Sequence, residues 1–151
     1  MHYNLGVTLQ ELGQLDAAVK SYEEALAINP DYAEAHNNLG VAFQELGRLD
    51  EAVTHCQKAI AIRPDYAEAH SNLGNILREI GRFGEAVGSY QNALAVKPEN
   101  TGVHNNLGLV FKELGRFDDA IASYHRALTI EPQSAPVHAN LGTVLREVGR
   151  L

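Results

Sequence analysis

The sequence predicts an all-α solenoid of antiparallel helix pairs, and three observations lead to this fold class. An Asn-Leu-Gly triplet returns every 34 residues along the 151-residue chain, first at 4–6 and last at 140–142. Apolar residues follow helical spacing within each period, and a second glycine divides each period into two such stretches. One helix pair cannot bury both of its apolar stripes, so neighbouring units have to stack and share a core.

The units follow one another along the whole chain as a single array. We place a partial unit at 1–32, complete units at 33–66, 67–100 and 101–134, and a first helix alone at 135–151. This division predicts nine helices. Both ends look like cuts through a longer array, whose next helix would cover the apolar stripe of the last one. The alternative is that this open end is itself a docking surface.

The first helix of a unit is expected to end at the second glycine. In the unit 33–66, Ala35, Leu39 and Ala42 stand at helical spacing, and Gly47 follows them. Glycine adopts left-handed backbone at no steric cost, which makes it a favourable residue just after the end of a helix. The glycines at this position are Gly13, Gly47, Gly81, Gly115 and Gly149.

The second helix starts after that glycine and stops at a proline, which cannot continue a helix. An aspartate three residues after the glycine is expected to cap this helix or to stabilise its positive end. The aspartates concerned are Asp16, Asp50 and Asp118. After the proline, Asp31, Asp65 or Ser134 is expected to cap the first helix of the next unit.

Glycines inside helices need a packing reason, because each costs roughly 1 kcal/mol relative to alanine. We expect the glycine of each Asn-Leu-Gly triplet to allow close approach of the partner helix at small residues such as Ala18 and Ala25. The unit 67–100 has additional glycines without that reason, at Gly84 and Gly88. Gly102 follows early in the next helix. The least stable part of the array is therefore predicted between residues 83 and 103.

The pattern resembles the tetratricopeptide repeat over the whole chain. The Leu-Gly pair, two alanines and the closing proline agree in every unit that contains them, as at 39–40, Ala52, Ala59 and Pro64. A histidine stands where the repeat has tryptophan, and Cys56 stands where it has an aromatic residue. The resemblance implies a right-handed superhelical solenoid whose first helices line a concave groove. The Asn-Leu-Gly core is similar to the repeat arms of O-linked N-acetylglucosamine transferases.

The asparagine of each triplet is the main candidate for binding. An asparagine side chain offers a donor and an acceptor, so a row of them can pair with the main chain of an extended peptide. In the transferase arms that the sequence resembles, asparagines at this position hold the substrate's main chain. The resemblance implies the same role for Asn4, Asn38, Asn72, Asn106 and Asn140. The alternative is that these residues, which we call the asparagine ladder, tether neighbouring helices or face water.

Further candidates lie near the ladder on the exposed stripe of the first helices. Three are the asparagines Asn37, Asn75 and Asn105. A second row changes from Gln10 and Gln44 to the cations Arg78, Lys112 and Arg146. These cations could pair with an acidic segment or a terminal carboxylate, although adjacent glutamates partly cancel them. The alternative is a surface charge pattern that serves solubility. The lysine, arginine and asparagine clamp of chaperone-tail-binding relatives is not reproduced.

Composition argues against several other classes of function. The net charge of −7, from 19 acidic and 12 basic residues, disfavours a nucleic-acid partner. Cys56 is the single cysteine, which excludes a disulfide framework and a cysteine-rich zinc site. Five histidines recur with the repeat, but stacked repeats lie about 10 Å apart, too far for one metal ion, so we expect them to pack. These histidines are His2, His36, His70, His104 and His138.

The function that follows is a non-enzymatic, cytoplasmic scaffold that binds an extended or helical peptide segment of another protein. No catalytic motif, cofactor motif or metal-ligand spacing is present, and no apolar stretch reaches the roughly 20 residues of a membrane span. One alternative is the substrate-recognition arm of a glycosyltransferase or other modifying enzyme whose catalytic domain lies outside this chain. Another is a module that self-associates head to tail through uncapped ends.

Overall fold

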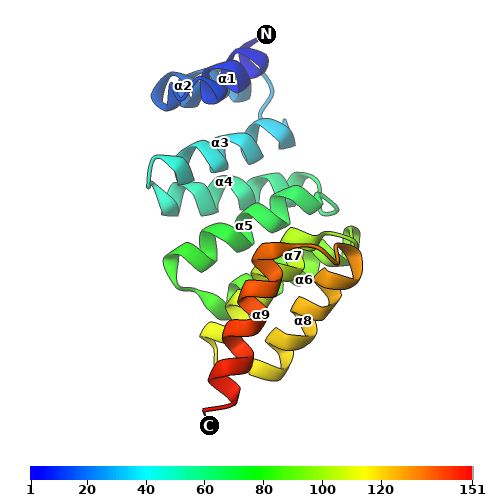
Figure 1. Ribbon diagram of the computed structural model, residues 1–151. Helices are drawn as coiled ribbons and strands as arrows, with labels where there is room; N and C mark the ends of the chain where they lie inside the picture. The colour runs from blue at the N-terminus through cyan, green and yellow to red at the C-terminus, as the bar shows by residue number, and fades with distance from the viewer. Residues whose placement is uncertain (151) are drawn as a thin grey trace.

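The computed structural model describes residues 1–150, and within that range it contains helices and connecting turns without a strand (Figure 1). The helices are α1 (His2–Glu11), α2 (Leu15–Ile28), α3 (Ala33–Glu45), α4 (Leu49–Ile62), α5 (Ala67–Ile80), α6 (Phe83–Val96), α7 (Thr101–Glu113), α8 (Phe117–Ile130) and α9 (Ala135–Val148). The predicted number and class of elements are confirmed.

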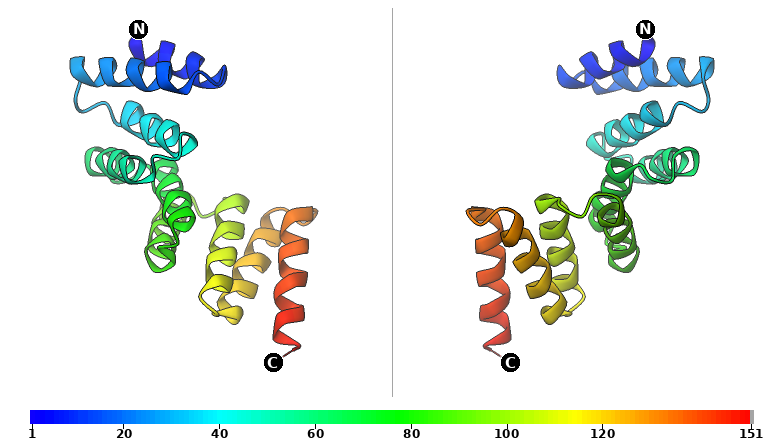
Figure 2. Two further views of the ribbon diagram at one scale, coloured as in Figure 1. Left: turned by 90° about the vertical axis from the view of Figure 1, so that its left-hand side faces the viewer. Right: turned by 90° about the vertical axis from the view of Figure 1, so that its right-hand side faces the viewer.

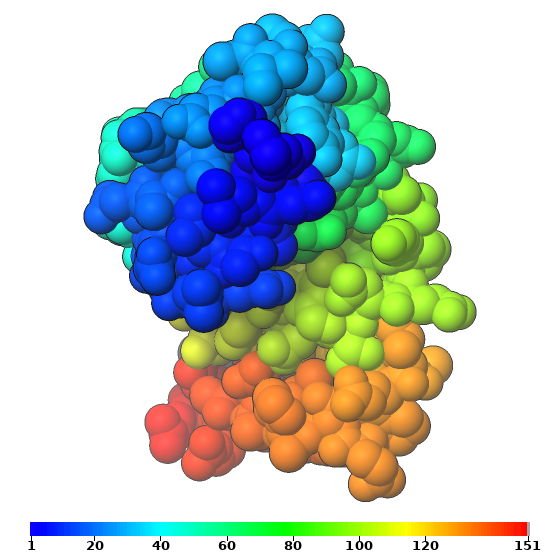
Figure 3. Space-filling model, turned by 90° about the horizontal axis from the view of Figure 1, so that it is seen from above, coloured from blue at the N-terminus to red at the C-terminus, as the bar shows by residue number. Residues whose placement is uncertain are grey.

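The helices pack as successive antiparallel pairs. Each odd-numbered helix packs on the helix that follows it, and each even-numbered helix packs on the first helix of the next pair. The first helices α1, α3, α5, α7 and α9 also contact one another in sequence, whereas the second helices of residues 1–150 do not. The first helices therefore lie on the inner side of the curve. The pairs rotate progressively along the stack (Figure 2), and the C-terminal pairs emerge beside the N-terminal ones in the view from above (Figure 3).

The glycine between paired helices adopts the expected left-handed backbone at four positions. The φ angles are 75° at Gly13 and Gly47, 93° at Gly81 and 71° at Gly115. The following residue then closes the helix end, as where the Arg48 amide donates to the carbonyl of Phe43 at 2.8 Å. The fifth glycine, Gly149, has a φ of −67° and does not follow the prediction.

Four of the five triplet glycines lie close to a side chain of the partner helix, and at Gly40 the carbonyl oxygen of an expected alanine, Ala52, also lies 3.1 Å from an added Cβ. At Gly142 no atom lies within 4 Å. A Cβ atom on Gly74 would lie 2.6 Å from the ring of Tyr90, and one on Gly40 would lie 2.6 Å from the sulfur of Cys56. Gly6 with Tyr22 and Gly108 with Tyr124 repeat the tyrosine contact. The close approach is confirmed at these four positions, where the residue at the tyrosine position makes the nearest contact.

The helix caps differ from the predicted ones. Asp50 lies in the first turn of α4 without a side-chain cap bond, so of its two expected roles only charge stabilisation remains. Asp31 and Asp65 do not cap, because the N-caps of α3 and α5 are the tyrosines that follow them. Ser134 is the N-cap of α9 by position but makes no side-chain cap bond. Asn100, which we did not predict, accepts from the Val103 amide at 3.0 Å.

The core runs through the stack as one cluster of buried apolar side chains. Tyr22, Tyr90 and Tyr124 are fully buried between paired helices, and Val144 extends the cluster into α9. Cys56 takes the tyrosine position in α4 and is also fully buried. This shared core fixes the first helices relative to one another, and the candidate groove is the inner surface that they line.

Candidate peptide-binding groove

The asparagine ladder lies on the five first helices, one member per helix. Asn4 is exposed on α1, and the members on α3, α5, α7 and α9 are half-buried. Because successive first helices contact one another, the ladder runs along the inner side of the array. The structure therefore places the predicted residues in one row, as the repeat period requires.

Each ladder member after the first donates a hydrogen bond to the preceding repeat. The side-chain nitrogen of Asn72 donates to Oδ1 of Asn37 at 3.0 Å, and that of Asn140 donates to Oδ1 of Asn105 at 2.9 Å. Asn38 donates to the hydroxyl of Tyr3 at 3.1 Å. In all three cases the acceptor lies 35 positions earlier in the chain.

The bond from Asn106 uses a different acceptor. The position 35 residues earlier holds Ser71, a shorter side chain, and Asn106 donates instead to Oδ1 of Asn75 at 3.0 Å, one helical turn further along α5. Asn75 Oδ1 also accepts from the hydroxyl of Tyr90 at 2.7 Å. The loss of an asparagine at one position of the repeat is thus compensated at another.

These bonds orient the ladder, and in its last three members they leave the side-chain oxygen available, whereas the oxygen of Asn38 accepts from Asn37 at 3.4 Å. Among residues 1–150, Oδ1 of Asn72, Asn106 and Asn140 accepts no hydrogen bond, and these oxygens are not buried. Each amide is therefore fixed through its nitrogen while its oxygen remains accessible. A row of oriented acceptors can receive donors from a ligand.

Asn37 has a different position from the other candidates. It is fully buried, accepts from Asn72 and donates to the carboxylate of Glu68 at 3.2 Å. This tethering role of Asn37 was not predicted from the sequence. The signal in the sequence is that each ladder asparagine after the first follows an acceptor position by 35 residues. That position holds asparagine at 37 and 105, but tyrosine at 3 and serine at 71. Direct contact between Asn37 and a peptide stays a prediction. In the structure the side chain of Asn37 is buried and holds Asn72.

The second row of candidates divides into a paired half and an unpaired half. In the N-terminal half, Gln10 donates to Glu45 at 2.7 Å and Gln44 donates to Glu79 at 2.9 Å, so that each glutamine bridges to the next repeat. Gln10 also accepts from the hydroxyl of Tyr22 at 2.8 Å. These glutamates are therefore already engaged within the array.

Of the cations in the C-terminal half, Arg78 and Arg146 have no ionic partner in residues 1–150, and Lys112 has one distant partner. Arg78 is half-buried, makes no ion pair and has its Nε atom buried without a hydrogen bond. The ammonium of Lys112 lies 3.8 Å from the carboxylate of Glu113, at the outer limit of an ion pair. Arg146 is exposed and lies 3.5 Å from the hydroxyl of Thr143. The structure does not bring the three cations into one cluster.

The repeated histidines hold the turns between repeats, which confirms their expected packing role. In His36, His70 and His104, Nε2 lies 2.8–2.9 Å from the carbonyl oxygen of the proline six residues earlier, and all three rings are buried. His138 makes the same contact on α9, although its side chain is exposed. His2 differs, because its Nδ1 atom lies 2.9 Å from the carboxylate of Glu24.

A second histidine joins the first in the repeat 33–66. Nδ1 of His36 lies 3.1 Å from Nδ1 of His55, and because Nε2 of His36 donates to Pro30, the proton between the two rings belongs to His55. Burial lowers the pKa of His55 to about 4. The neighbouring Cys56 faces Gly40, and burial raises the pKa of its thiol to about 12. A thiol in that environment stays protonated at neutral pH.

Within residues 1–150, no group of three or more histidine, cysteine, aspartate or glutamate side chains is arranged to hold a metal ion. In the same part of the chain, no helix combines the length and hydropathy that crossing a membrane requires.

Comparison with known proteins identifies the repeat. A model described as TPR repeat matches residues 8–47, and two models described as tetratricopeptide repeat match residues 31–99 and 71–135. None of the curated proteins matches the chain significantly.

Several solved structures share the fold. A crystal structure of MamA is 25% identical, with a TM-score of 0.90 over 95% of this chain and 84% of that chain. MamA 41-end from Desulfovibrio magneticus RS-1 is 22% identical, with a TM-score of 0.90 over 97% and 83%. The APC/C hetero-tetramer Cut9-Hcn1 is 22% identical, with a TM-score of 0.87 over 95% of this chain and 29% of that chain. Helix pairing, repeat signature and family models agree that residues 8–135 of this chain consist of tetratricopeptide repeats.

Proposed function

We propose that this array is a non-enzymatic scaffold that binds an extended or helical peptide segment of another protein in the groove lined by its first helices. The observation that carries the proposal is the row of accessible amide oxygens on Asn72, Asn106 and Asn140. Backbone N–H groups of a peptide can donate to such a row whatever the peptide sequence.

The tethers favour binding by this row. The side-chain nitrogen of each of these asparagines is fixed by a hydrogen bond of 2.9–3.0 Å to the preceding repeat. A side chain that is already ordered loses little conformational entropy when a ligand arrives. The ladder thus combines the two roles that the sequence left as alternatives, one of its atoms holding the array and another facing the ligand.

The cations support a preference in one half of the groove. Arg78 and Arg146 have no ionic partner among the described residues and Lys112 lies 3.8 Å from Glu113, whereas the glutamines of the N-terminal half are bonded to glutamates. An acidic side chain or a terminal carboxylate of the ligand would therefore be accepted best at the C-terminal half.

The test compares peptide capture by three versions of the chain. A diverse library of unstructured peptides is presented to the wild type, to Asn72→Ala/Asn106→Ala, and to Gln57→Ala/Asn92→Ala. The first variant removes ladder oxygens, whereas the control variant removes two exposed amides of the second helices α4 and α6 and keeps the whole ladder with its tethers. We expect capture to be lost in the first variant and retained in the control, at a temperature where circular dichroism shows equal helicity.

Two outcomes would contradict the proposal. Equal capture by the wild type and the ladder variant would make the ladder structural and direct the search to other surfaces. Absence of capture by the wild type would remove the groove as a general peptide site. The similar structure Cut9-Hcn1 is a hetero-tetramer, and this supports the proposal that a chain with this fold binds another protein.

The resemblance of the Asn-Leu-Gly core to transferase arms supports a variant of this proposal. In that variant the groove presents substrates to a catalytic domain outside this chain. Comparing the coding sequence that follows residue 151 with transferase genes tests the variant, because a downstream catalytic domain supports it and an unrelated sequence contradicts it.

Self-association is the second candidate function, favoured by apolar surface at the two ends of the array. A hollow of about 310 Å³ at the N-terminal end is lined by residues that include Tyr3, Ile28 and Tyr32, and Ile28 is 74% exposed. Leu145 and Val148 are exposed on α9. Light scattering over a concentration series tests this candidate, since a constant monomer mass would exclude it.

A further inference from the structure

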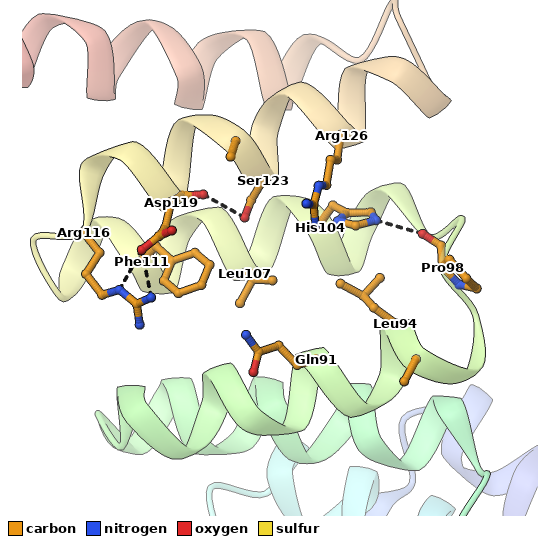
Figure 4. Close-up of a pocket in the computed structure, with 12 residues that line it drawn as sticks. Gln91, Leu94, Pro98, His104, Leu107, Phe111, Arg116, Asp119, Ser123 and Arg126 are labelled. Carbon is orange, nitrogen blue, oxygen red and sulfur yellow. Dashed lines mark hydrogen bonds and ion pairs between the residues drawn. The ribbon is translucent and has the colours of Figure 1, made fainter.

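A hollow of about 430 Å³ opens between α6 and α8 over the face of α7, which lies between them in Figure 4. Leu107 and Phe111 of α7 form its apolar floor, and Leu94 of α6 lies at one side. Ser123 and Arg126 of α8 lie at the other side. The hollow belongs to the side of the array that carries the second helices, so it is separate from the asparagine ladder.

His104 presents an incomplete hydrogen-bond arrangement in this hollow. Its side chain is 6% exposed, and its Nε2 atom donates to the carbonyl of Pro98 at 2.8 Å. The neutral ring therefore keeps a lone pair on Nδ1, and this buried atom has no partner among residues 1–150. Buried acceptors in proteins are nearly always satisfied, so a missing donor calls for an explanation.

The repeat 33–66 shows which group completes the same arrangement. His36 and Phe43 stand at the positions of His104 and Phe111 two repeats earlier. There the ring of His55 donates from Nδ1 to Nδ1 of His36 at 3.1 Å and lies 5.5 Å from the ring of Phe43. An aromatic ring with an N–H donor thus occupies this place within the chain's own structure.

Serine replaces that ring in the repeat 101–134. Ser123 stands at the position of His55, and its hydroxyl donates to the carbonyl of Asp119 at 3.0 Å rather than to His104. The substitution removes both a ring and the donor for the histidine. The hollow is therefore deficient in the group that His55 supplies two repeats earlier.

The charges around the hollow favour a neutral occupant. Arg116 is paired with Asp119 at 2.8 Å and lies over the ring of Phe111. Arg126 is exposed, has no ionic partner within residues 1–150 and lies beside His104 (Figure 4). It can move aside for a ligand and then contact the face of an aromatic ring, whereas it would repel a cation.

We propose that this hollow binds an aromatic side chain carrying an O–H or N–H donor, such as tyrosine or tryptophan, from a partner protein. The ring lies on Leu107 and Phe111, and its donor completes the hydrogen bonding of His104 Nδ1. This site is independent of the groove, and its presence or absence leaves the proposed peptide binding unaffected.

Capped amino acids test the proposal on the full chain. Histidine-¹⁵N-labelled protein is titrated with N-acetyl-tyrosinamide, N-acetyl-tryptophanamide and the donor-free N-acetyl-phenylalaninamide, and the His104 signals are assigned by their loss in His104→Gln. We expect the Nδ1 resonance of His104 to shift with the first two probes. The tyrosine probe should bind about three- to tenfold more tightly than the phenylalanine probe, as one hydrogen bond supplies.

Two matched variants locate the binding. Ser123→His introduces a histidine at the repeat position that His55 holds in the unit 33–66. Its ring should fill the hollow and abolish probe binding. Ser89→His makes the same change one repeat earlier and should leave binding intact. Equal affinity for the tyrosine and phenylalanine probes, unchanged binding to Ser123→His, or no shift of His104 up to probe solubility would each overturn the proposal. The comparison of probes on the wild type does not depend on how the variants fold.

Discussion

At the scale of single residues, His36 and His55 form a hydrogen bond in which His36 accepts at Nδ1, so the ring of His36 has to be neutral. The pKa of each is lowered, chiefly by burial, and the positive charge of Lys58 adds to the effect, while Glu51 opposes it at His55 and Asp31 at His36. The unfolded chain protonates these rings near pH 6.5, but the folded chain resists until about pH 4 at His55. The stability that they contribute is therefore complete above pH 6.5 and is lost as the pH falls toward 4.

The prediction is a loss of about 1–3 kcal/mol in the free energy of unfolding between pH 6.5 and 4. Urea unfolding followed by circular dichroism at several pH values measures it. The matched control is His55→Ser, because serine stands at this position in the other repeats. The variant should have a flatter pH dependence, and an unchanged dependence would show that other groups cause it.

The triplet glycines allow a second comparison between identical substitutions. At Gly40, an added Cβ would lie 2.6 Å from the sulfur of Cys56 and 3.1 Å from the carbonyl oxygen of Ala52. At Gly142, no atom lies within 4 Å of an added Cβ. Alanine has the better helix propensity at both positions, so only the contact can reverse the sign.

We expect Gly40→Ala to lower the free energy of unfolding by about 1–3 kcal/mol through overpacking. We expect Gly142→Ala to raise it by up to about 1 kcal/mol. Thermal unfolding of the two variants checks both values. Stabilisation of both would mean that the helices of the pair can move apart without loss.

At the scale of an element, α6 is the helix that its sequence weakens most. Gly84 takes the place of the first-turn aspartate, and Gly88 lies within the helix. A Cβ at either position would meet open space, so neither glycine is required by packing. Amide hydrogen exchange should therefore be faster across residues 83–96 than across α4 or α8. Uniform protection of the helices within residues 1–150 would contradict this expectation.

The substitution Gly88→Ala measures the effect of helix propensity on α6 without a change in packing, because an added Cβ meets no atom within 4 Å. It should raise the free energy of unfolding by about 1 kcal/mol and slow exchange in α6. Gly40→Ala serves as the comparison, because there the same change meets a close contact. A destabilised Gly88→Ala variant would show that this glycine has a role that its open surroundings do not indicate.

At the scale of the whole molecule, stability depends on each repeat and on its interface with the next. The ladder bonds cross these interfaces, so the pair Asn37 and Asn72 should be coupled. A double-mutant cycle with both residues changed to alanine is expected to give a coupling energy of about 0.5–1.5 kcal/mol. The cycle of Asn37 with Asn106, which do not contact, is the control and should be additive. Additivity in both cycles would show that the hydrogen bond between Asn72 and Asn37 does not stabilise the array.

Much of this fold could be predicted because it depends on local rules that the chain repeats. The 34-residue period, the glycines that end the first helices and the prolines that end the second ones determine the helix pairs and their number. The caps at Asp31 and Asp65 were predicted wrongly, because the exact N-cap depends on where the chain leaves the preceding turn. The row of ladder asparagines could be predicted from its period, but their partners could not.

The sequence by itself thus determined the helices, the stacking and the row of asparagines, since these follow from spacing along one chain. The tertiary structure alone decided that Asn106 bonds to Asn75 rather than to Ser71, that Tyr90 requires Gly74, and that His104 lacks the donor that His36 has. These contacts join residues on different helices. Their existence depends on side-chain length and helix separation, quantities that periodicity does not specify but packing does.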